Sequence, residues 1–318
     1  MKKTALIVIN LGTPQAPSSS AIRTFLRKFL SDKRVVKLPR WFWLPILYGL
    51  ILPFRPKKLV SAYQAIWTTE GSPLESGMKN LVHRIQRPPY EVRYAMSYSQ
   101  PSLSSVIKKC VMDTSYHRII LIPLYPQYTS STTGAVFDEI SKNLQQNRWI
   151  PNLSFIHSYY DHPLYICALA HSVKEFWDKN PKPQRLIMSF HGIPQREVDK
   201  GDPYAIHCQT TAEKLAHALG LEKHEWMLVY QSRFGKAPWL QPYCDKTLQS
   251  LPPQGITHVH IICPGFAMDC LETLEEIAVT NKKQFLQAGG KSYDYIPALN
   301  ASEQQCQLIT ALIEDTLA

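Results

Sequence analysis

RLIMSFHGIP, residues 185–194, runs from an apolar, strand-like segment directly into a turn that contains Gly192 and Pro194. The ionisable ring of His191 stands where the apolar run ends. Residues 8–14, VINLGTP, repeat this order: a strand-like run, a polar residue, a glycine, and a proline two positions later. The repetition favours two similar domains within one chain.

Segments typical of strands alternate with segments typical of helices along the whole sequence. Strands are expected at residues 4–10, 90–96, 117–124, 152–157, 185–190, 226–231, 257–263 and 293–297. Helices are expected at residues 19–30, 73–86, 103–112, 132–146, 163–179, 203–219, 241–250, 269–286 and 302–316. Such alternation predicts an α/β fold in which helices cover both faces of parallel sheets. The continuous apolar run HRIILIPL is typical of a strand that is buried on both faces.

We therefore predict two doubly wound, Rossmann-like domains with a cleft between them. The N-terminal α/β domain is expected over residues 1–170, and the C-terminal domain, which carries His191 and Glu272, over residues 171–318. Open α/β sheets bind ligands beyond the carboxyl ends of their strands, where both Gly-x-Pro turns lie.

The composition narrows the classes of protein that the chain can belong to. Of its 318 residues, 45% are hydrophobic, which is typical of a folded protein, and the formal net charge of +10 favours anionic ligands or surfaces. Aromatic and basic residues do not interleave, so we expect no nucleic-acid partner. Seven scattered cysteines form no C-x-x-C pair, which argues against a disulfide framework or a zinc ribbon. The start of the chain does not resemble a signal peptide, and we expect a cytoplasmic protein.

Residues 38–54, LPRWFWLPILYGLILPF, are almost wholly apolar, and basic residues flank them. Their prolines divide the segment into pieces that are too short to span a bilayer. One interpretation is a buried helical hairpin. The other is an amphipathic lip that rests on an anionic membrane or receives a flat apolar ligand.

Residues 266–280, FAMDCLETLEEIAVT, carry an acidic stripe into a predicted helix. Asp269 is placed to cap the helix, while Glu272 and Glu276 are four residues apart and share one face. The stripe can be a capped, solvated helix start, or it can conduct cations or protons. His191 can likewise be a structural residue. If His191 and Glu272 approach each other, they form a mixed site for a transition metal or a pair for proton removal.

Several segments taken together make the sequence recognisable. They are SFHGIP, DKGDPY, YQSRFGKAPWLQP, YPQYTSSTTG and GFAMDCLETLEE. In this combination the chain resembles the ferrochelatases, which insert ferrous iron into a porphyrin to make haem. The resemblance extends from residue 10 to the last helix, and it implies two doubly wound domains that enclose a porphyrin cleft.

The resemblance also implies roles for matched residues. His191 and Glu272 are expected to be catalytic and to contact the metal, and Asp269 and Glu276 to lie on a proton or metal path. Residues expected to bind the porphyrin are Leu11, Arg55, Tyr63, Ser72, Tyr98 and Trp239. Residues 38–54 match an apolar lip that the family presents to membranes.

The sequence departs from some ferrochelatases at two informative positions. Ser97 precedes Tyr98 where many relatives have an arginine, which removes a positive charge. Ser130 stands where some relatives have a cysteine that binds an iron–sulfur cluster, so we predict no cluster and no other cofactor, with Fe²⁺ as a substrate.

We expect insertion of iron into protoporphyrin IX to give haem b, because the long apolar lip suits the less charged ring. Coproporphyrin III is the alternative substrate. A carrier that binds haem or metal without joining iron to porphyrin is the alternative outside enzymes. A nucleotide-sugar transferase lacks support, because no glycine-rich diphosphate loop is evident.

Overall fold

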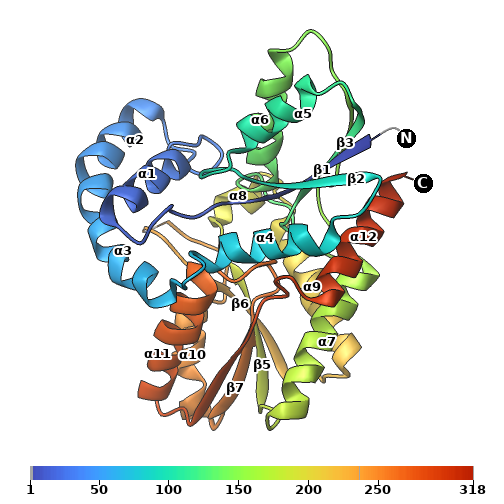
Figure 1. Cartoon of the computed structure of the whole chain (residues 1–318). Coiled ribbons are helices and arrows are strands. Elements are labelled where there is room, and N and C mark those ends of the chain that lie inside the picture. The colour runs from blue at the N-terminus through green and yellow to red at the C-terminus, as the bar shows by residue number, and fades with distance from the viewer. Residues whose placement is uncertain (1–2, 236, 318) are drawn as a thin grey trace. The chain divides into compact units, whose positions relative to one another are not determined.

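The computed structural model describes residues 3–235 and 237–317, which form two compact units (Figure 1). One unit comprises Met1–Ser158 together with Ile309–Ala318, and the other comprises Tyr159–Leu308. The domain boundary expected between residues 170 and 171 falls inside helix α7 (Pro163–Lys179). The chain leaves the first unit before this helix and returns to it for its last residues.

Each unit contains one four-stranded parallel sheet, and the two sheets have the same strand order relative to the chain. In the first unit β1 (Lys3–Asn10), β2 (Tyr90–Met96), β3 (Tyr116–Pro123) and β4 (Asn152–Phe155) lie in the order β2-β1-β3-β4. In the second unit β5 (Arg185–His191), β6 (Trp226–Gln231), β7 (His258–Ile262) and β8 (Ser292–Ile296) lie in the order β6-β5-β7-β8. All pairings are parallel. The α/β fold and the eight expected strands are confirmed, and the two similar turns follow the first strand of each sheet.

Helices cover the sheets of both units. The first unit holds α1 (Ser19–Leu30), α2 (Arg40–Ile46), the π-helix η1 (Leu47–Ile51), α3 (Leu52–Ile66), α4 (Pro73–Ile85), α5 (Leu103–Met112) and α6 (Thr133–Gln145). The second holds α7, α8 (Gln195–Asp199), α9 (Tyr204–Leu219), α10 (Cys244–Ser250), the 3-10 helix η2 (Pro252–Gln254), the π-helix η3 (Glu272–Asn281) and α11 (Lys282–Gln287). Helix α12 (Glu303–Leu317) runs from the second unit into the first. Figure 1 shows α10 and α11 on one face of the second sheet and α7 and α9 on the other.

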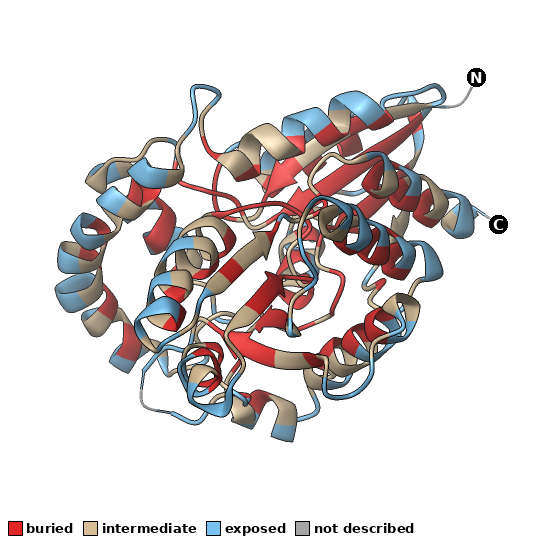
Figure 2. Cartoon of the chain, turned by 90° about the horizontal axis from the view of Figure 1, so that it is seen from below, coloured by how far each residue is buried: buried red, intermediate tan, exposed pale blue. Residues whose placement is uncertain are grey.

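The central strands form the core of each unit, as their apolar sequences predict. Residues 5–9 of β1 are wholly buried, and Ile119 to Ile122 of β3 are at most 1% exposed. Figure 2 shows the strands as largely buried and many helices with one buried and one exposed side. In α1 the buried residues are Ile22, Phe25, Leu26 and Leu30. Each fully buried Leu or Ile side chain stabilises the fold by about 1.5–3 kcal/mol, so the sheets are the rigid part on which loops are positioned.

Residues 38–54 do not form a buried hairpin, so this interpretation was wrong. Helices α2, η1 and α3 follow one another with helical backbone angles at both junctions, and the chain does not reverse. Trp43, Leu47 and Leu52 are buried, whereas other large apolar side chains point into solvent. These are Trp41, Phe42, Tyr48, Leu50 and Phe54. None of the helices in the described part of the chain is both long enough and apolar enough to cross a bilayer.

Candidate active site

The second sheet places His191 at its topological switch point. The chain passes from β5 to β6 on one side, and β7 pairs with β5 on the other. In open α/β sheets such a point, at the carboxyl ends of the strands, is the usual ligand site. His191 is the last residue of β5 and is half-buried. Its Nδ1 lies 2.7 Å from the carbonyl oxygen of Gly192, which can only accept, so Nδ1 carries the hydrogen and Nε2 keeps the lone pair.

The turn after His191 packs closely against the segment that carries Trp239. A Cβ on Gly192 would lie 3.0 Å from the backbone oxygen of Gln231 and 3.2 Å from the Trp239 ring, so any other residue would require these neighbours to shift by a few tenths of an ångström. Two backbone hydrogen bonds hold the segments together: Leu240 N–H to the Ile193 carbonyl and Gln195 N–H to the Pro238 carbonyl, both at 3.0 Å. The half-buried Trp239 is therefore fixed beside the histidine turn.

The acidic segment, residues 266–280, folds differently from what the sequence predicted. It forms the π-helix η3, which begins at Glu272, rather than an α-helix capped by Asp269. The buried Asp269 carboxylate instead accepts hydrogen bonds from Thr273 Oγ1 at 2.9 Å, Tyr295 OH at 2.6 Å and Asn300 Nδ2 at 2.7 Å. Asp269 thus joins the start of the π-helix to β8 and to the chain after it.

Glu272 and Glu276 remain on the same side of the helix. A π-helix closes i→i+5 hydrogen bonds, so residues four apart are slightly less than one turn apart. Ser232 binds the carboxylate of Glu276 twice: its backbone N–H donates to Oε1 at 2.8 Å, and its hydroxyl donates to Oε2. The side chain of Gln231 donates to the backbone carbonyl of Glu272 at 3.1 Å. Gln231 and Ser232, at the end of β6, therefore hold Glu272 and Glu276 in place.

His191 and Glu272 both act electrostatically on Glu276. Burial raises the pKa of the Glu276 carboxyl, and the Glu272 charge raises it further. The hydrogen bonds from Ser232 and the His191 charge act in the opposite direction and lower this pKa. Glu276 is therefore a carboxyl that exchanges a proton closer to neutral pH than an exposed glutamate does.

Gln231 and Ser232 were missed by the sequence analysis, although Gln231 ends a strand that it predicted and Ser232 directly follows it. Gln231 is almost wholly buried, and its Oε1 accepts hydrogen bonds from Ser189 Oγ at 2.8 Å and Cys263 Sγ at 3.6 Å. It thereby ties together the ends of β5, β6 and β7. The sequence signal that could have identified them was a pair of polar residues at the end of an apolar strand.

The remaining expected residues, Trp239 apart, lie in the first unit. Leu11 and Tyr98 follow β1 and β2 and are joined by a backbone hydrogen bond of 3.0 Å from Tyr98 to Leu11. The buried Tyr98 also donates its hydroxyl to Asp32 at 2.8 Å, an acid that the sequence analysis did not identify. Arg55 and Tyr63 are on α3, and the buried Ser72 precedes α4.

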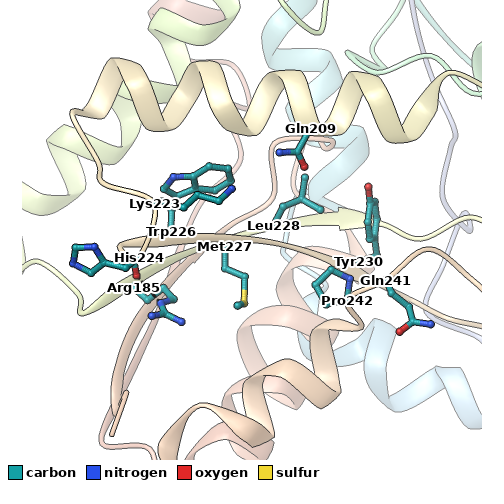
Figure 3. A pocket seen from close by; sticks show the side chains of 10 residues that line it. All are labelled: Arg185, Gln209, Lys223, His224, Trp226, Met227, Leu228, Tyr230, Gln241 and Pro242. Atoms are coloured by element: carbon teal, nitrogen blue, oxygen red, sulfur yellow. Dashed lines mark hydrogen bonds between the residues drawn. The ribbon is translucent and has the colours of Figure 1, made fainter. Parts of the chain in front are cut away.

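A separate pocket of about 350 Å³ opens at β6, the edge strand of the second sheet (Figure 3). Its lining residues are Arg185, Gln209, Lys223, His224, Trp226, Met227, Leu228, Tyr230, Gln241 and Pro242. Leu228 and Met227 point to opposite sides of the strand in Figure 3, so the pocket wraps around the sheet edge. None of the expected site residues lines it, and we assign it no part in the site.

Comparison with solved structures supports the fold. SirB from Bacillus subtilis with Fe³⁺ superimposes with a TM-score of 0.57, covering 99% of this chain and 96% of that one. The sequences are 12% identical, so this likeness concerns the architecture alone.

Comparison of sequences identifies the family. A family model described as Ferrochelatase matches residues 3–317. The ferrochelatase of Methylococcus capsulatus is 48% identical over 318 residues, which cover 99% of this chain and 97% of that protein. The coproporphyrin III ferrochelatase of Streptococcus mutans is 47% identical over 322 residues, with 99% of both chains covered. The chain therefore belongs to the ferrochelatase family of metal chelatases, enzymes that insert a metal ion into a porphyrin.

Proposed function

We propose that this chelatase inserts Fe²⁺ into protoporphyrin IX, releasing two pyrrole protons and forming haem b. The observation that carries the proposal is that the end of β6 joins the two acids to the strand of His191: Gln231 pairs with His191 and binds the Glu272 carbonyl, and the next residue, Ser232, binds the Glu276 carboxylate. His191, Glu272 and Glu276, the proposed catalytic group, combine an imidazole lone pair with two carboxyl groups, which is the chemistry that metal transfer and proton removal both need.

We assign different roles to the three groups. Nε2 of His191 keeps its lone pair in the neutral ring, so it can take a pyrrole proton or bind the incoming iron. Glu272, at the first turn of the π-helix, is the proposed carboxylate ligand for the iron. Glu276 is the proposed next proton acceptor, because burial raises the pKa of its carboxyl.

The test of His191 is the variant His191→Ala. We expect metallation of porphyrin to fall at least about 100-fold while porphyrin still binds, because the proton acceptor is lost and the apolar contacts remain. The loss of free-base porphyrin absorption under anaerobic Fe²⁺ measures the rate, and porphyrin titration measures binding. His217→Ala, an exposed histidine on α9, is the matched control. A near-normal rate in His191→Ala would remove this residue from the mechanism.

The same assay tests Glu272. The variant Glu272→Gln keeps the shape of the side chain and removes its charge. We expect it to slow metal insertion more than it weakens porphyrin binding. Unchanged turnover would contradict the assignment.

The identity of the porphyrin is a separate part of the proposal. The exposed apolar side chains of residues 41–54 suit the two-carboxylate ring of protoporphyrin. The similarity to a coproporphyrin III ferrochelatase makes the four-carboxylate ring the second candidate. We expect a higher kcat/KM for protoporphyrin IX, and the opposite ratio would assign coproporphyrin III instead. The proposed porphyrin contacts to vary in this assay are Leu11, Arg55, Tyr63, Ser72, Tyr98 and Trp239.

We further propose that residues 38–54 rest on an anionic membrane through their exposed apolar side chains. Trp41, Leu50 and Phe54 are 79%, 62% and 61% exposed, and the exposed Lys57 and Lys58 follow them. Replacing these three apolar residues by glutamate should weaken binding to vesicles with acidic lipids at least about 100-fold, because each apolar side chain contributes about 1.5–3 kcal/mol when buried. Ile206→Glu is the control, since Ile206 is also apolar and 67% exposed. Equal vesicle binding of the triple variant would refute the proposal.

The protein is proposed to hold no cofactor. Ser130 offers a hydroxyl, not a thiolate, and this hydroxyl accepts a hydrogen bond of 2.7 Å from Lys37. Iron and sulfide analysis of anaerobically purified protein tests this, and stoichiometric sulfide would contradict it.

A further inference from the structure

We propose that the second unit contains an additional site for a divalent transition metal, formed by His258, His260 and Asp294. Their side chains bring three potential ligand atoms within 4.8 Å of one another. Two histidines and one carboxylate are a ligand set that suits Zn²⁺, Co²⁺ and Fe²⁺. The two histidines lie on β7 and the aspartate on the neighbouring strand β8, so the sheet itself sets their positions.

The distances between these atoms fit a metal site. Nε2 of His258 lies 3.3 Å from Nε2 of His260, and the latter lies 3.7 Å from Oδ2 of Asp294. Zinc–nitrogen bonds of about 2.0–2.1 Å at tetrahedral angles place two ligand nitrogens about 3.3–3.4 Å apart. The two nitrogens, which share a hydrogen bond in the arrangement observed, already have this spacing, and Oδ2 of Asp294 lies a few tenths of an ångström further from Nε2 of His260 than a bound ligand would.

The site is reachable from solvent and lies away from the catalytic group. His260 is wholly buried, but His258 is half-buried and the Asp294 side chain is 39% exposed. On the sheet, His260 pairs with Leu186, and His191 stands five residues further along β5. At about 3.3 Å per residue the separation along the strand is about 16 Å, so one metal ion cannot serve both sites.

Trp177 on α7 opposes metal binding in the arrangement observed. Its indole N–H can only donate, and it donates to Nδ1 of His260 at 3.0 Å, so the hydrogen of the neutral His260 ring is on Nε2. A metal at Nε2 requires that this proton leaves and that Nδ1 becomes protonated. The indole N–H of Trp177 and the new N–H at Nδ1 of His260 would then point at each other. The half-buried Trp177 side chain must therefore turn away. The tryptophan therefore weakens the site and also reports on its occupancy.

Cobalt binding to the full-length protein tests the proposal. All variants in this test are made in a His191→Ala parent protein, which lacks the histidine of the catalytic group. The probe is Co²⁺ under anaerobic conditions. We expect one bound ion with visible absorption bands and quenching of tryptophan fluorescence. His258→Ala and Asp294→Asn should each weaken this binding at least about tenfold, whereas the exposed control His217→Ala should not. Absence of a bound ion, or equal affinity in His258→Ala, would overturn the proposal.

The variant Trp177→Phe is expected to bind Co²⁺ more tightly than the parent, which is the opposite of the effect expected for His258→Ala and Asp294→Asn. Phenylalanine keeps an aromatic ring but has no N–H, so Co²⁺ should bind about tenfold more tightly because the opposing donor is gone. An affinity equal to or below that of the parent would contradict the role of Trp177. In the chain that retains His191, the His258→Ala variant should metallate porphyrin at the normal rate. The additional site and the catalytic proposal can therefore fail independently.

Discussion

Ser232 holds its backbone at a φ of +62°, in the left-handed region that residues with a Cβ rarely occupy. This conformation lets both its N–H and its hydroxyl donate to the carboxylate of Glu276. Strain of this kind persists where surrounding structure over-determines it, and it is common at functional sites. Here its consequence is electrostatic, because the two donors favour the ionised form of Glu276 against the effect of burial.

The pH dependence of metal insertion should depend on this contact. If ionised Glu276 accepts protons, activity falls as the pH drops through its raised pKa. Ser232→Gly removes the hydroxyl donor but keeps the N–H and tolerates the positive φ, so the pKa rises further and the acid limb of the rate profile should move to higher pH. The measurement is kcat/KM for metal insertion against pH.

Glu276→Gln provides the control for this assignment. It removes the ionisable group, so the acid limb should disappear. An acid limb that stays in place in both variants would belong to a different residue.

At the scale of elements, the π-helix η3 owes its starting point to distant partners. Asp269 accepts hydrogen bonds from Thr273, Tyr295 and Asn300, and its backbone N–H donates to Asn300 Oδ1 at 2.8 Å. These bonds fix the residues before Glu272, so the helix begins after them. Asp269, three residues before Glu272, is therefore held in place by its own set of hydrogen bonds.

Asp269→Ala should destabilise the protein by about 3 kcal/mol, because it leaves several buried donors without an acceptor. Urea unfolding monitored by circular dichroism measures this loss. Glu275→Ala, a half-buried acid on the same π-helix, is the control and should cost less. Equal losses in the two variants would show that the bonds of Asp269 do not stabilise the segment.

At the scale of the whole molecule, the two units share one strand order, and the end of the chain belongs to the first of them. Residues 309–318 complete the first unit although the 150 residues before them form the second. Among these last residues, Ile309, Leu312 and Ile313 are at most 5% exposed. Glu314 forms an ion pair with Arg87 at 3.3 Å.

Ile313→Ala should therefore destabilise the first unit by about 2–5 kcal/mol, the usual effect of emptying a buried aliphatic position. Hydrogen exchange should accelerate in β1 and β3 before it accelerates in β5 and β7. The exposed Leu317, replaced by alanine, should leave exchange almost unchanged. Earlier loss of protection in β5 and β7 would contradict the assignment of α12 to the first unit.

The sequence by itself determined the eight strands, most helices, the α/β class and the family. These properties depend on apolar periodicity and on motifs that are local in the chain, such as SFHGIP and GFAMDCLETLEE. His191 at the end of β5 was predictable for the same reason, because a strand-ending turn is a local feature.

Only the tertiary structure decided what depends on contacts between distant residues. The π-helix begins at Glu272 because Asp269 bonds to Tyr295 and Asn300, and the carboxylate of Glu276 is held by Ser232, forty-four positions away. Likewise, the last ten residues return to the first unit. No local pattern encodes these pairings, because their free energy exists only once the sheets have brought the partners together.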